Sequence, residues 1–533
     1  MEKRTISSRR RPPRRPQDCS AARRERSPSR PAMSAFQYPD ERTASYGPPF
    51  RRGSARRRPM DWLDSQAVLR PDKTALISNE GTRISYRELA SLARRAAGTL
   101  RAAGMRAGDR LAVLAENRVE TIAALFAARA HGWTLCPLNW RLAPAELAAV
   151  LDDFRPAVLL HDSAYAATAK AAGRGVPVAL EVLGVGESFA GEILPDPEAI
   201  VLVLYTSGTT GRPKGAMLSN RMLDANARQT VQGWGLRGED ATVNSAPLFH
   251  TGGWNVLTLP LLWIGGTVHL HAKFDPARVA ALLREGKVDA VFGVPTMFQA
   301  LLSENLDGAR PRFLISGGAP CPAPLAAAYR ARGLFFKQGF GMTEIGPNCF
   351  FIPDDAVETK GASVGLPMPG TEMKLTDKHG RRARSGELWI RGPHAFSGYS
   401  GLPRETAGAL QDGWVRTGDL AERDAEGFYY ILGRRKEMFI SGGENVFPVE
   451  VESSLLEHPG VREAAVIGAP DARWGEVGAA FVVASKGGVS PEALREYLDG
   501  KLARYKIPKR FHLVDSLPKN AMGKILKSSL RES

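Results

Sequence analysis

The chain has 533 residues and a formal net charge of +16, with 43% hydrophobic and 24% charged residues. This length exceeds what one hydrophobic core usually serves, so we expect at least two domains, and the composition excludes a disordered, collagen-like or disulfide-stapled protein. The four cysteines are widely spaced and form no CxxC pair, which argues against a zinc ribbon or redox dithiol and favours a cytoplasmic protein.

The positive charge is concentrated at the amino terminus. Residues 1–60 hold 17 Lys or Arg against five Asp or Glu, so the rest of the chain carries only +4. Residues 1–59 are rich in Arg, Pro and Ser and lack an apolar period, which predicts a disordered basic arm, and we favour a non-functional extension. Nucleic-acid binding through this arm is the alternative from another class of function. We expect no nucleic-acid partner, and the arm lacks the apolar segment of a signal peptide.

From residue 60 to about residue 365, apolar runs alternate between strand and helix patterns. Helices are predicted at residues 86–103 and 121–130. Strands are predicted at the short apolar runs 110–115, 135–138, 157–160, 199–205, 267–270, 290–294 and 313–316. This alternation predicts an α/β fold with parallel sheets covered by helices. The most apolar stretch, residues 254–268, is shorter than the roughly 20 residues that span a bilayer, so we expect no transmembrane segment.

After residue 365 the pattern changes to short strands separated by glycine turns. Strands predicted at 374–376, 386–391 and 428–432 indicate an antiparallel β subdomain. We predict a large N-terminal domain of residues 60–432, a polar hinge at 433–437 and a small C-terminal α/β domain of residues 438–533. The small domain has predicted helices at 449–457 and 491–502 and predicted strands at 461–468 and 479–484.

An apolar strand, residues 201–205, leads into a loop of small, hydroxylated and glycine residues. The loop consists of Thr206, Ser207, Gly208, Thr209, Thr210, Gly211, Arg212, Pro213, Lys214 and Gly215. Its glycines let backbone N–H groups approach an anion, its hydroxyls add donors, and Lys214 adds positive charge. The loop suits a polyphosphate. Its spacing is not that of a Walker A loop, which argues against a kinase or GTPase.

Residues 361–365 match the GxSxG pattern of serine hydrolases. That motif requires a strand before it and a helix after it. Pro367 and Pro369 follow and would break the helix, so we reject a hydrolase.

The phosphate loop, read as YTSGTTGRPKG, resembles the signature of the adenylate-forming superfamily, which includes acyl-CoA synthetases, luciferases and peptide-synthetase adenylation domains. Further segments resemble the family's other motifs in the family's order: QGFGMTE at 338–344, TGDL at 417–420, GRRKE at 433–437 and PKNAMGKI at 518–525. The resemblance covers about residues 60–533. It implies activation of a carboxylic acid by ATP and Mg²⁺ to an acyl adenylate, followed by thioester formation with coenzyme A.

The resemblance also implies roles for residues. Thr206 to Lys214 would hold the β- and γ-phosphates, Glu344 would hold Mg²⁺, and Thr343 would contact the α-phosphate or the acyl carboxylate. Lys524 would stabilise the transition state of adenylate formation. The other implied nucleotide contacts are Gly317, Gly318, Ala319, Gln338, Gly339, Phe340 and Gly341 around adenine, and Asp419 and Arg434 at the ribose.

The family's small domain rotates between the two half-reactions. Lys436 would be the hinge residue. Gly442 and Gly443 would then line the tunnel for the pantetheine arm, where the absence of side chains allows close approach.

The segment PLFHTGGW, residues 247–254, resembles the family's acyl side. His250 would flank the substrate carboxylate or be an ordinary packed histidine. Trp254, Val294, Met297 and Phe298 would form an apolar wall with little to pair with a second carboxylate. We therefore predict a medium- or long-chain fatty acid as substrate, with an aryl acid as the alternative and malonate disfavoured. Loading of a carrier protein in place of CoA stays open, as does a homodimer.

Overall fold

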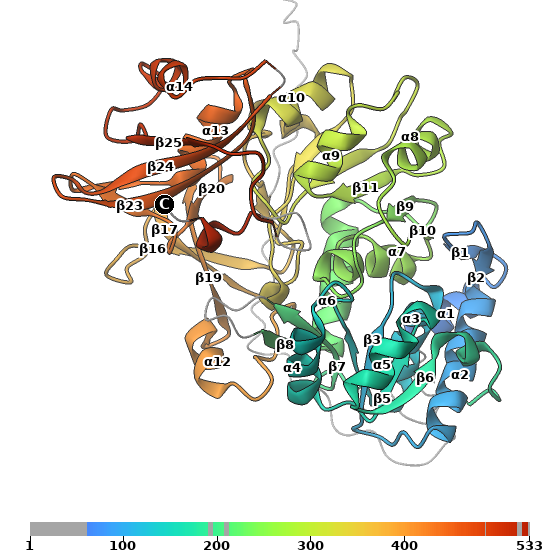
Figure 1. Cartoon of the computed structure of the whole chain (residues 1–533). Coiled ribbons are helices and arrows are strands. Elements are labelled where there is room, and N and C mark those ends of the chain that lie inside the picture. The colour runs from blue at the N-terminus through green and yellow to red at the C-terminus, as the bar shows by residue number, and fades with distance from the viewer. Residues whose placement is uncertain (1–60, 190–195, 207–212, 486, 520–524, 531–533) are drawn as a thin grey trace, which may run out of the picture. The chain divides into compact units, whose positions relative to one another are not determined.

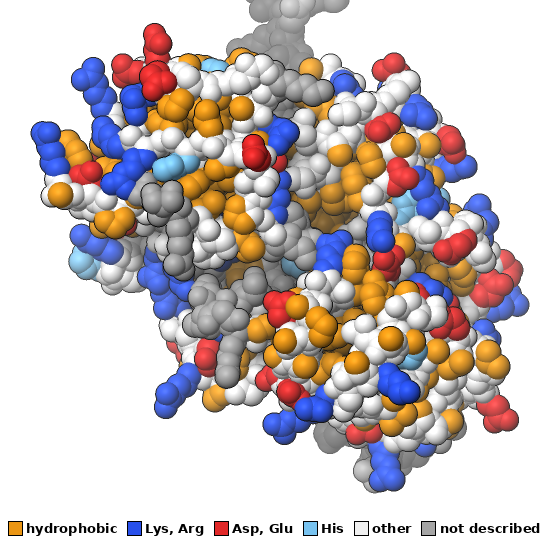
Figure 2. Space-filling view, viewed as in Figure 1, with side chains coloured by type: hydrophobic (Ala, Val, Ile, Leu, Met, Phe, Trp, Pro, Cys, Tyr) orange, Lys and Arg blue, Asp and Glu red, His pale blue; other side chains and the backbone are white. Residues whose placement is uncertain are grey.

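The computed structural model describes residues 61–189, 196–206, 213–485, 487–519 and 525–530. The chain divides into two units, residues 1–57 and 58–533, and the described residues belong to the second. The predicted basic arm lies outside them, so its disorder and its lack of a nucleic-acid partner stay predictions. On the face shown in Figure 2, basic and acidic side chains are interspersed. This agrees with the low net charge, +4, of the chain after residue 60.

A six-stranded sheet has the order β6-β5-β3-β4-β7-β8, and its strands are parallel except β8. They are β3 (Arg110–Leu114), β4 (Thr134–Pro137), β5 (Val158–His161), β6 (Val176–Ala179), β7 (Ile200–Thr206) and β8 (Lys214–Ser219). Alternate residues of β3 enter two different cores, because successive strand side chains point to opposite faces. Leu111 and Val113 pack with helices α2 (Tyr86–Ala102) and α3 (Val119–His131), whereas Ala112 and Leu114 pack with α4 (Pro144–Phe154). Helices thus cover both faces, as predicted (Figure 1). A further short helix, α5 (Ala166–Ala172), contributes Ala169 to the α4 core.

A seven-stranded sheet has the order β13-β12-β11-β9-β10-β1-β2, parallel except for β2. Its strands are β1 (Thr74–Ile77), β2 (Arg83–Ser85), β9 (Ala241–Asn244), β10 (Thr267–Leu270), β11 (Ala290–Gly293), β12 (Phe313–Ser316) and β13 (Phe336–Gln338). One face packs on α8 (Pro276–Arg284), α9 (Pro295–Leu301) and α10 (Ala323–Ala331). The other joins the main core, which includes α6 (Asn220–Trp234) and α7 (Thr258–Ile264).

The apolar stretch at residues 254–268 is folded into this core as a π-helical turn, Gly252–Val256, followed by α7 and β10. Among the described residues, no helix combines the length and the apolar character needed to cross a bilayer. The GxSxG segment lies between α11 (Val357–Lys360) and β15 (Leu366–Pro367), which pairs with β14 (Phe350–Phe351). This order is the reverse of strand–turn–helix, so the rejection of a hydrolase is confirmed.

The β subdomain is an antiparallel sheet, as predicted. It comprises β16 (Glu372–Thr376), β17 (Ser385–Arg391), β18 (Leu410–Gln411), β19 (Trp414–Arg423) and β20 (Tyr429–Arg434), with α12 (Pro403–Ala409) before β18. The predicted hinge, 433–437, begins inside β20, because Gly433 and Arg434 still pair with Leu420 and Asp419.

The C-terminal residues form their own sheet with separate apolar clusters. Its elements are β21 (Phe439–Ser441), β22 (Glu444–Val446), α13 (Pro448–Leu456), β23 (Val461–Asp471), β24 (Gly475–Ala484), α14 (Pro491–Leu498) and β25 (Arg510–Leu513). The prediction missed β22 and also β25, which pairs parallel to β24. It also began β24 four residues late, since the glycines at 475 and 478 read as loop residues.

A buried arginine joins three helices of the N-terminal part. The side chain of Arg129, in α3, is 1% exposed and pairs at 3.0 Å with Asp61 and at 3.0 Å with Asp224 of α6. Asp61 is also the N-cap of α1 (Trp62–Leu69). The Arg129 guanidinium carbon lies 5.3 Å from the centre of the Trp62 ring. Removing one partner of such a buried pair leaves the other charges uncompensated, which is costly.

We predict that Arg129→Met lowers the free energy of unfolding by about 3 kcal/mol, measured by urea denaturation followed by tryptophan fluorescence. The matched control is Arg87→Met, because Arg87 pairs with Asp72 at the surface, where the two side chains are 62% and 86% exposed. The control is expected to change stability by less than about 1 kcal/mol. Equal changes in the two variants would contradict a structural role for Arg129.

Candidate active site

Three parallel strands end side by side at the predicted adenine segments. The Gly317 N–H donates to the Gly293 carbonyl at 3.2 Å, and the Gly339 N–H donates to the Ser316 carbonyl at 2.8 Å. Val294, Gly317 and Gly339 therefore follow β11, β12 and β13 at one edge of the sheet. In open α/β sheets, this carboxyl edge is where ligands bind.

An aromatic residue that the sequence analysis did not single out lies between the predicted adenine and acyl segments. A Cβ atom built on Gly317 would lie 3.3 Å from the Phe292 ring, and one on Gly252 would lie 2.9 Å from it. Phe292 is half-buried in β11. The two glycines thus let the segments approach opposite sides of one ring.

The predicted metal residue sits on a buried turn after β13. Thr343 and Glu344 belong to a 3₁₀ turn, Thr343–Ile345, and are 6% and 7% exposed. A Cβ on Gly341 would lie 2.2 Å from the Pro347 carbonyl carbon, so only glycine allows the chain to close this loop. The Tyr399 hydroxyl donates a hydrogen bond to Glu344 Oε1 at 2.6 Å.

The strands that flank the phosphate loop are described, although part of the loop is not. Thr206 and Lys214 are register partners at the ends of β7 and β8. Ser207, Gly208, Thr209, Thr210 and Gly211 lie outside the described residues, so their phosphate contacts stay predictions. The Lys214 ammonium lies 5.3 Å from the centre of the Tyr399 ring. Tyr399 therefore connects the end of the phosphate loop with Glu344.

The two predicted ribose residues form an ion pair. Asp419 and Arg434 face each other across β19 and β20, and Arg434 Nε lies 2.7 Å from Asp419 Oδ1. Asp419 is 4% exposed, and its backbone N–H donates to Thr417 Oγ1 at 3.0 Å. The predicted adenine residue Phe340 connects to β20 through two ring contacts: an edge-to-face contact with Phe350 at a centroid distance of 5.8 Å, and a tilted contact of Phe350 with Tyr429 at 5.4 Å.

The predicted acyl residues occupy two kinds of environment. Trp254 and Phe298 are fully buried: the Trp254 indole donates to the Leu248 carbonyl, and Phe298 packs among core rings. Val294 lies at the strand edge, 3.6 Å from a Cβ built on Gly318, whereas His250 and Met297 are half-buried. Their roles as a pocket wall stay predictions.

The predicted site residues of the C-terminal part lie in turns or outside the described residues. Lys436 is exposed between β20 and β21. Gly442 and Gly443 form the β21–β22 turn with φ of +61° and +89°, and a Cβ on Gly442 would lie 2.8 Å from the Trp474 ring. Lys524 lies outside the described residues.

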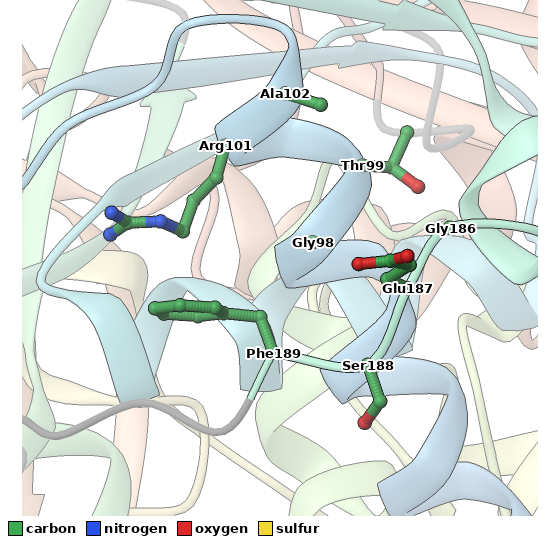
Figure 3. Close-up of a pocket in the computed structure, with 8 residues that line it drawn as sticks. All are labelled: Gly98, Thr99, Arg101, Ala102, Gly186, Glu187, Ser188 and Phe189. Carbon is green, nitrogen blue, oxygen red and sulfur yellow. The ribbon is translucent and has the colours of Figure 1, made fainter.

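A cavity of about 310 Å³ lies elsewhere, between α2 and residues 186–189 (Figure 3). Arg101 stacks on Phe189 there, with its guanidinium carbon 4.3 Å from the ring centre. None of the residues that line it was predicted for the site.

A Mg²⁺ ion would find oxygen donors at the 343–345 turn. The Glu344 carboxylate and the Thr343 hydroxyl are both of the type that Mg²⁺ prefers. Among the described residues, no group of three or more His, Cys, Asp or Glu could hold a metal ion by itself. This fits an ion carried largely by the phosphates of its nucleotide, which is how Mg²⁺ is commonly bound.

Comparison with known proteins decides the family. Residues 63–400 match the model of the AMP-binding enzyme, and residues 450–524 match that of the AMP-binding enzyme C-terminal domain. The chain belongs to the AMP-binding enzyme family. This confirms the resemblance to the adenylate-forming superfamily and the predicted α/β fold class.

Family members with known names resemble the chain over almost their whole length. Feruloyl-CoA synthase of Amycolatopsis sp. is 40% identical, over 88% of this chain and 98% of that protein. Indoleacetate–CoA ligase of Aromatoleum aromaticum is 34% identical, over 89% and 97%. The o-succinylbenzoate-CoA synthetase MenE of Bacillus subtilis, solved with the acyl-adenylate OSB-AMP, is 33% identical with a TM-score of 0.82, covering 89% of this chain and 98% of that one. The same enzyme has been solved with ATP and a magnesium ion, at 33% identity and a TM-score of 0.81 over 88% and 99% of the two chains.

This AMP-binding enzyme is an AMP-forming acid–CoA ligase that uses ATP, Mg²⁺ and coenzyme A. The predicted enzyme class and cofactors are therefore confirmed. CoA is the acceptor that the relatives support, in preference to a carrier protein.

A ribose-binding role for Asp419 predicts that Asp419→Asn weakens ATP binding by about 10- to 100-fold, the range for losing hydrogen bonds to a charged group. Isothermal titration of ATP into the acid-free enzyme measures this. The control is Glu372→Gln, because Glu372 pairs with Arg391 at 2.6 Å on the same sheet but is 59% exposed. Unchanged ATP affinity in Asp419→Asn would show that the carboxylate has only a structural role.

Proposed function

We propose that this ligase activates an aromatic carboxylic acid. The observation that carries the proposal is the 40% identity to a feruloyl-CoA synthase along 98% of that enzyme. Two further relatives, indoleacetate–CoA ligase and o-succinylbenzoate-CoA synthetase, also bear the names of aromatic acids. The relatives thus favour the aryl-acid alternative over the fatty acid that the sequence analysis placed first.

The acyl-side residues are compatible with an aromatic substrate. Phe292 presents a half-buried ring between the predicted adenine and acyl segments, and Val294 lies beside it at the strand edge. Aromatic rings prefer offset or edge contacts with other rings, which orients a flat substrate better than a flexible chain. The segments 247–254 and 292–298 contain no Lys or Arg to pair with a second carboxylate.

In the first half-reaction, an oxygen of the substrate carboxylate attacks the α-phosphorus of ATP, and pyrophosphate leaves. Both reactants are anions, so the site must supply oriented donors and positive charge. We assign this task to the loop from Thr206 to Lys214, to Thr343 and to Lys524. Glu344 would hold Mg²⁺, which supplies charge neutralisation to the phosphates when bound. Asp419 and Arg434 would position the ribose.

In the second half-reaction, the thiol sulfur of CoA attacks the acyl carbon, and AMP leaves. We propose that the C-terminal part, residues 438–533, turns about the segment 433–437 between the two steps. Lys524 would then leave, and Gly442 and Gly443 would approach the pantetheine arm. Gly433 and Arg434 are held in β20, so we place the moving bonds at residues 435–437, where Lys436 is exposed.

The substrate class is tested with a panel of ferulate, indoleacetate, 2-succinylbenzoate, octanoate and palmitate, with ATP, Mg²⁺ and CoA. The rate of AMP release and the acyl-CoA product are measured. We expect the best aromatic acid to have a kcat/KM at least about tenfold above either fatty acid, which corresponds to about 1.4 kcal/mol. A fatty acid that reacts faster than every aromatic acid would overturn the aryl proposal.

The hinge is tested with Lys436→Pro, since proline fixes the φ angle of that residue. We expect thioester formation from supplied acyl adenylate and CoA to fall much more than pyrophosphate exchange from acid and ATP. Lys436→Ala is the control, because it keeps the backbone free and removes only the side chain. Equal losses in both half-reactions of Lys436→Pro would contradict the hinge assignment.

A further inference from the structure

Tyr399 contacts the carboxylate that we assign to the metal. Its hydroxyl donates to Glu344 Oε1 at 2.6 Å, a short distance typical of a hydrogen bond to a charged acceptor. Glu344 is 7% exposed, so this bond is made where water competes little.

The same side chain contacts the end of the phosphate loop. The Lys214 ammonium lies 5.3 Å from the centre of the Tyr399 ring, within the range of a cation–π contact. The edge of one tyrosine therefore contacts the predicted metal carboxylate, and its face contacts the predicted phosphate lysine.

The backbone around Tyr399 is fixed on both sides. The Met217 N–H donates to the Gly398 carbonyl at 2.9 Å, and the Ser400 N–H donates to the Gly215 carbonyl at 2.8 Å. The Tyr399 N–H donates to the hydroxyl of Thr406 in α12 at 2.9 Å. The phenol is thus held on a rigid segment and can impose a direction on Glu344.

We propose that Tyr399 is a positioning residue, whose hydroxyl fixes one oxygen of Glu344 so that the other faces the Mg²⁺ of bound Mg–ATP. The proposal rests on the proposed function, in which Glu344 holds that ion. The terminal torsion of a glutamate is broad, so an isolated carboxylate samples many directions. A hydrogen bond to one oxygen removes this freedom, and such supporting partners commonly contribute 10- to 100-fold to metal affinity.

The test is Tyr399→Phe, which removes the hydroxyl and keeps the ring beside Lys214. ATP is titrated into the acid-free enzyme by calorimetry, once with excess Mg²⁺ and once with EDTA. We expect ATP affinity in EDTA to stay within about twofold of wild type. In Mg²⁺ it should fall by about 10- to 100-fold, so the gain in affinity from Mg²⁺ shrinks by that factor. The Mg²⁺ concentration for half-maximal pyrophosphate exchange should rise in parallel, with the rate recovered at high Mg²⁺.

Two variants calibrate this measurement. Tyr86→Phe removes a phenol that is 0% exposed and donates to the Gly266 carbonyl at 2.7 Å, and it should leave the gain from Mg²⁺ unchanged. Glu344→Gln should reduce the gain at least as much as Tyr399→Phe, and the double variant should add nothing further.

The outcomes separate the inference from the function on which it rests. A normal gain from Mg²⁺ in Tyr399→Phe, or an equal loss of ATP affinity with and without Mg²⁺, overturns the positioning role. A normal gain in Glu344→Gln overturns the assignment of Glu344 and the inference together. Loss of the gain in both single variants, with wild-type melting temperatures, supports the proposal.

Discussion

The backbone hydrogen bonds between β8 and residues 397–400 join the two halves of the proposed nucleotide site. The six-stranded sheet ends in the phosphate loop, whereas Glu344 follows the last strand of the seven-stranded sheet. Residues 397–400 pair with β8, and the N–H of Phe396 donates to the Glu344 carbonyl at 2.9 Å. The charged groups from the two sheets are therefore held in one arrangement before any substrate binds. Such preorganisation matters when two anions must react, because the protein then does not have to reorient its dipoles during the reaction.

Close backbone packing is the second constraint on the site. Gly317 and Gly252 allow two segments to approach Phe292, and Gly341 allows the chain around the Thr343–Ile345 turn to close on Pro347. These contacts carry no charge and take no part in the chemistry. They affect, however, where the chemical groups lie, because a Cβ at Gly341 would collide with the Pro347 backbone, and one at Gly252 or Gly317 would press on the Phe292 ring.

In the proposed site, the choice of acid depends on fewer residues than the reaction with ATP does. In the proposed site, the phosphate loop, the Thr343–Glu344 turn and the Asp419–Arg434 pair would bind parts of ATP, the substrate that does not differ from one acid to another. The proposed acyl side depends on a few apolar side chains, such as Phe292 and Val294, and such residues can differ between proteins that share one fold. The names of the relatives therefore carry more information about the acid than the nucleotide site does.

The sequence by itself determined the alternation of strands and helices, the family and the reaction class, since these depend on local periodicity and on motifs of adjacent residues. It gave no bounds for α6, which lies among the helices expected between strands, and it missed β22 and β25, because strands of three and four residues are too short to give a periodic signal. Only the tertiary structure decided that Tyr399 joins Lys214 to Glu344, that Phe292 lies between two binding segments and that Asp419 pairs with Arg434. These contacts join residues 15 to 185 positions apart, and the register of strands and the packing of loops, which no local pattern specifies, bring them together.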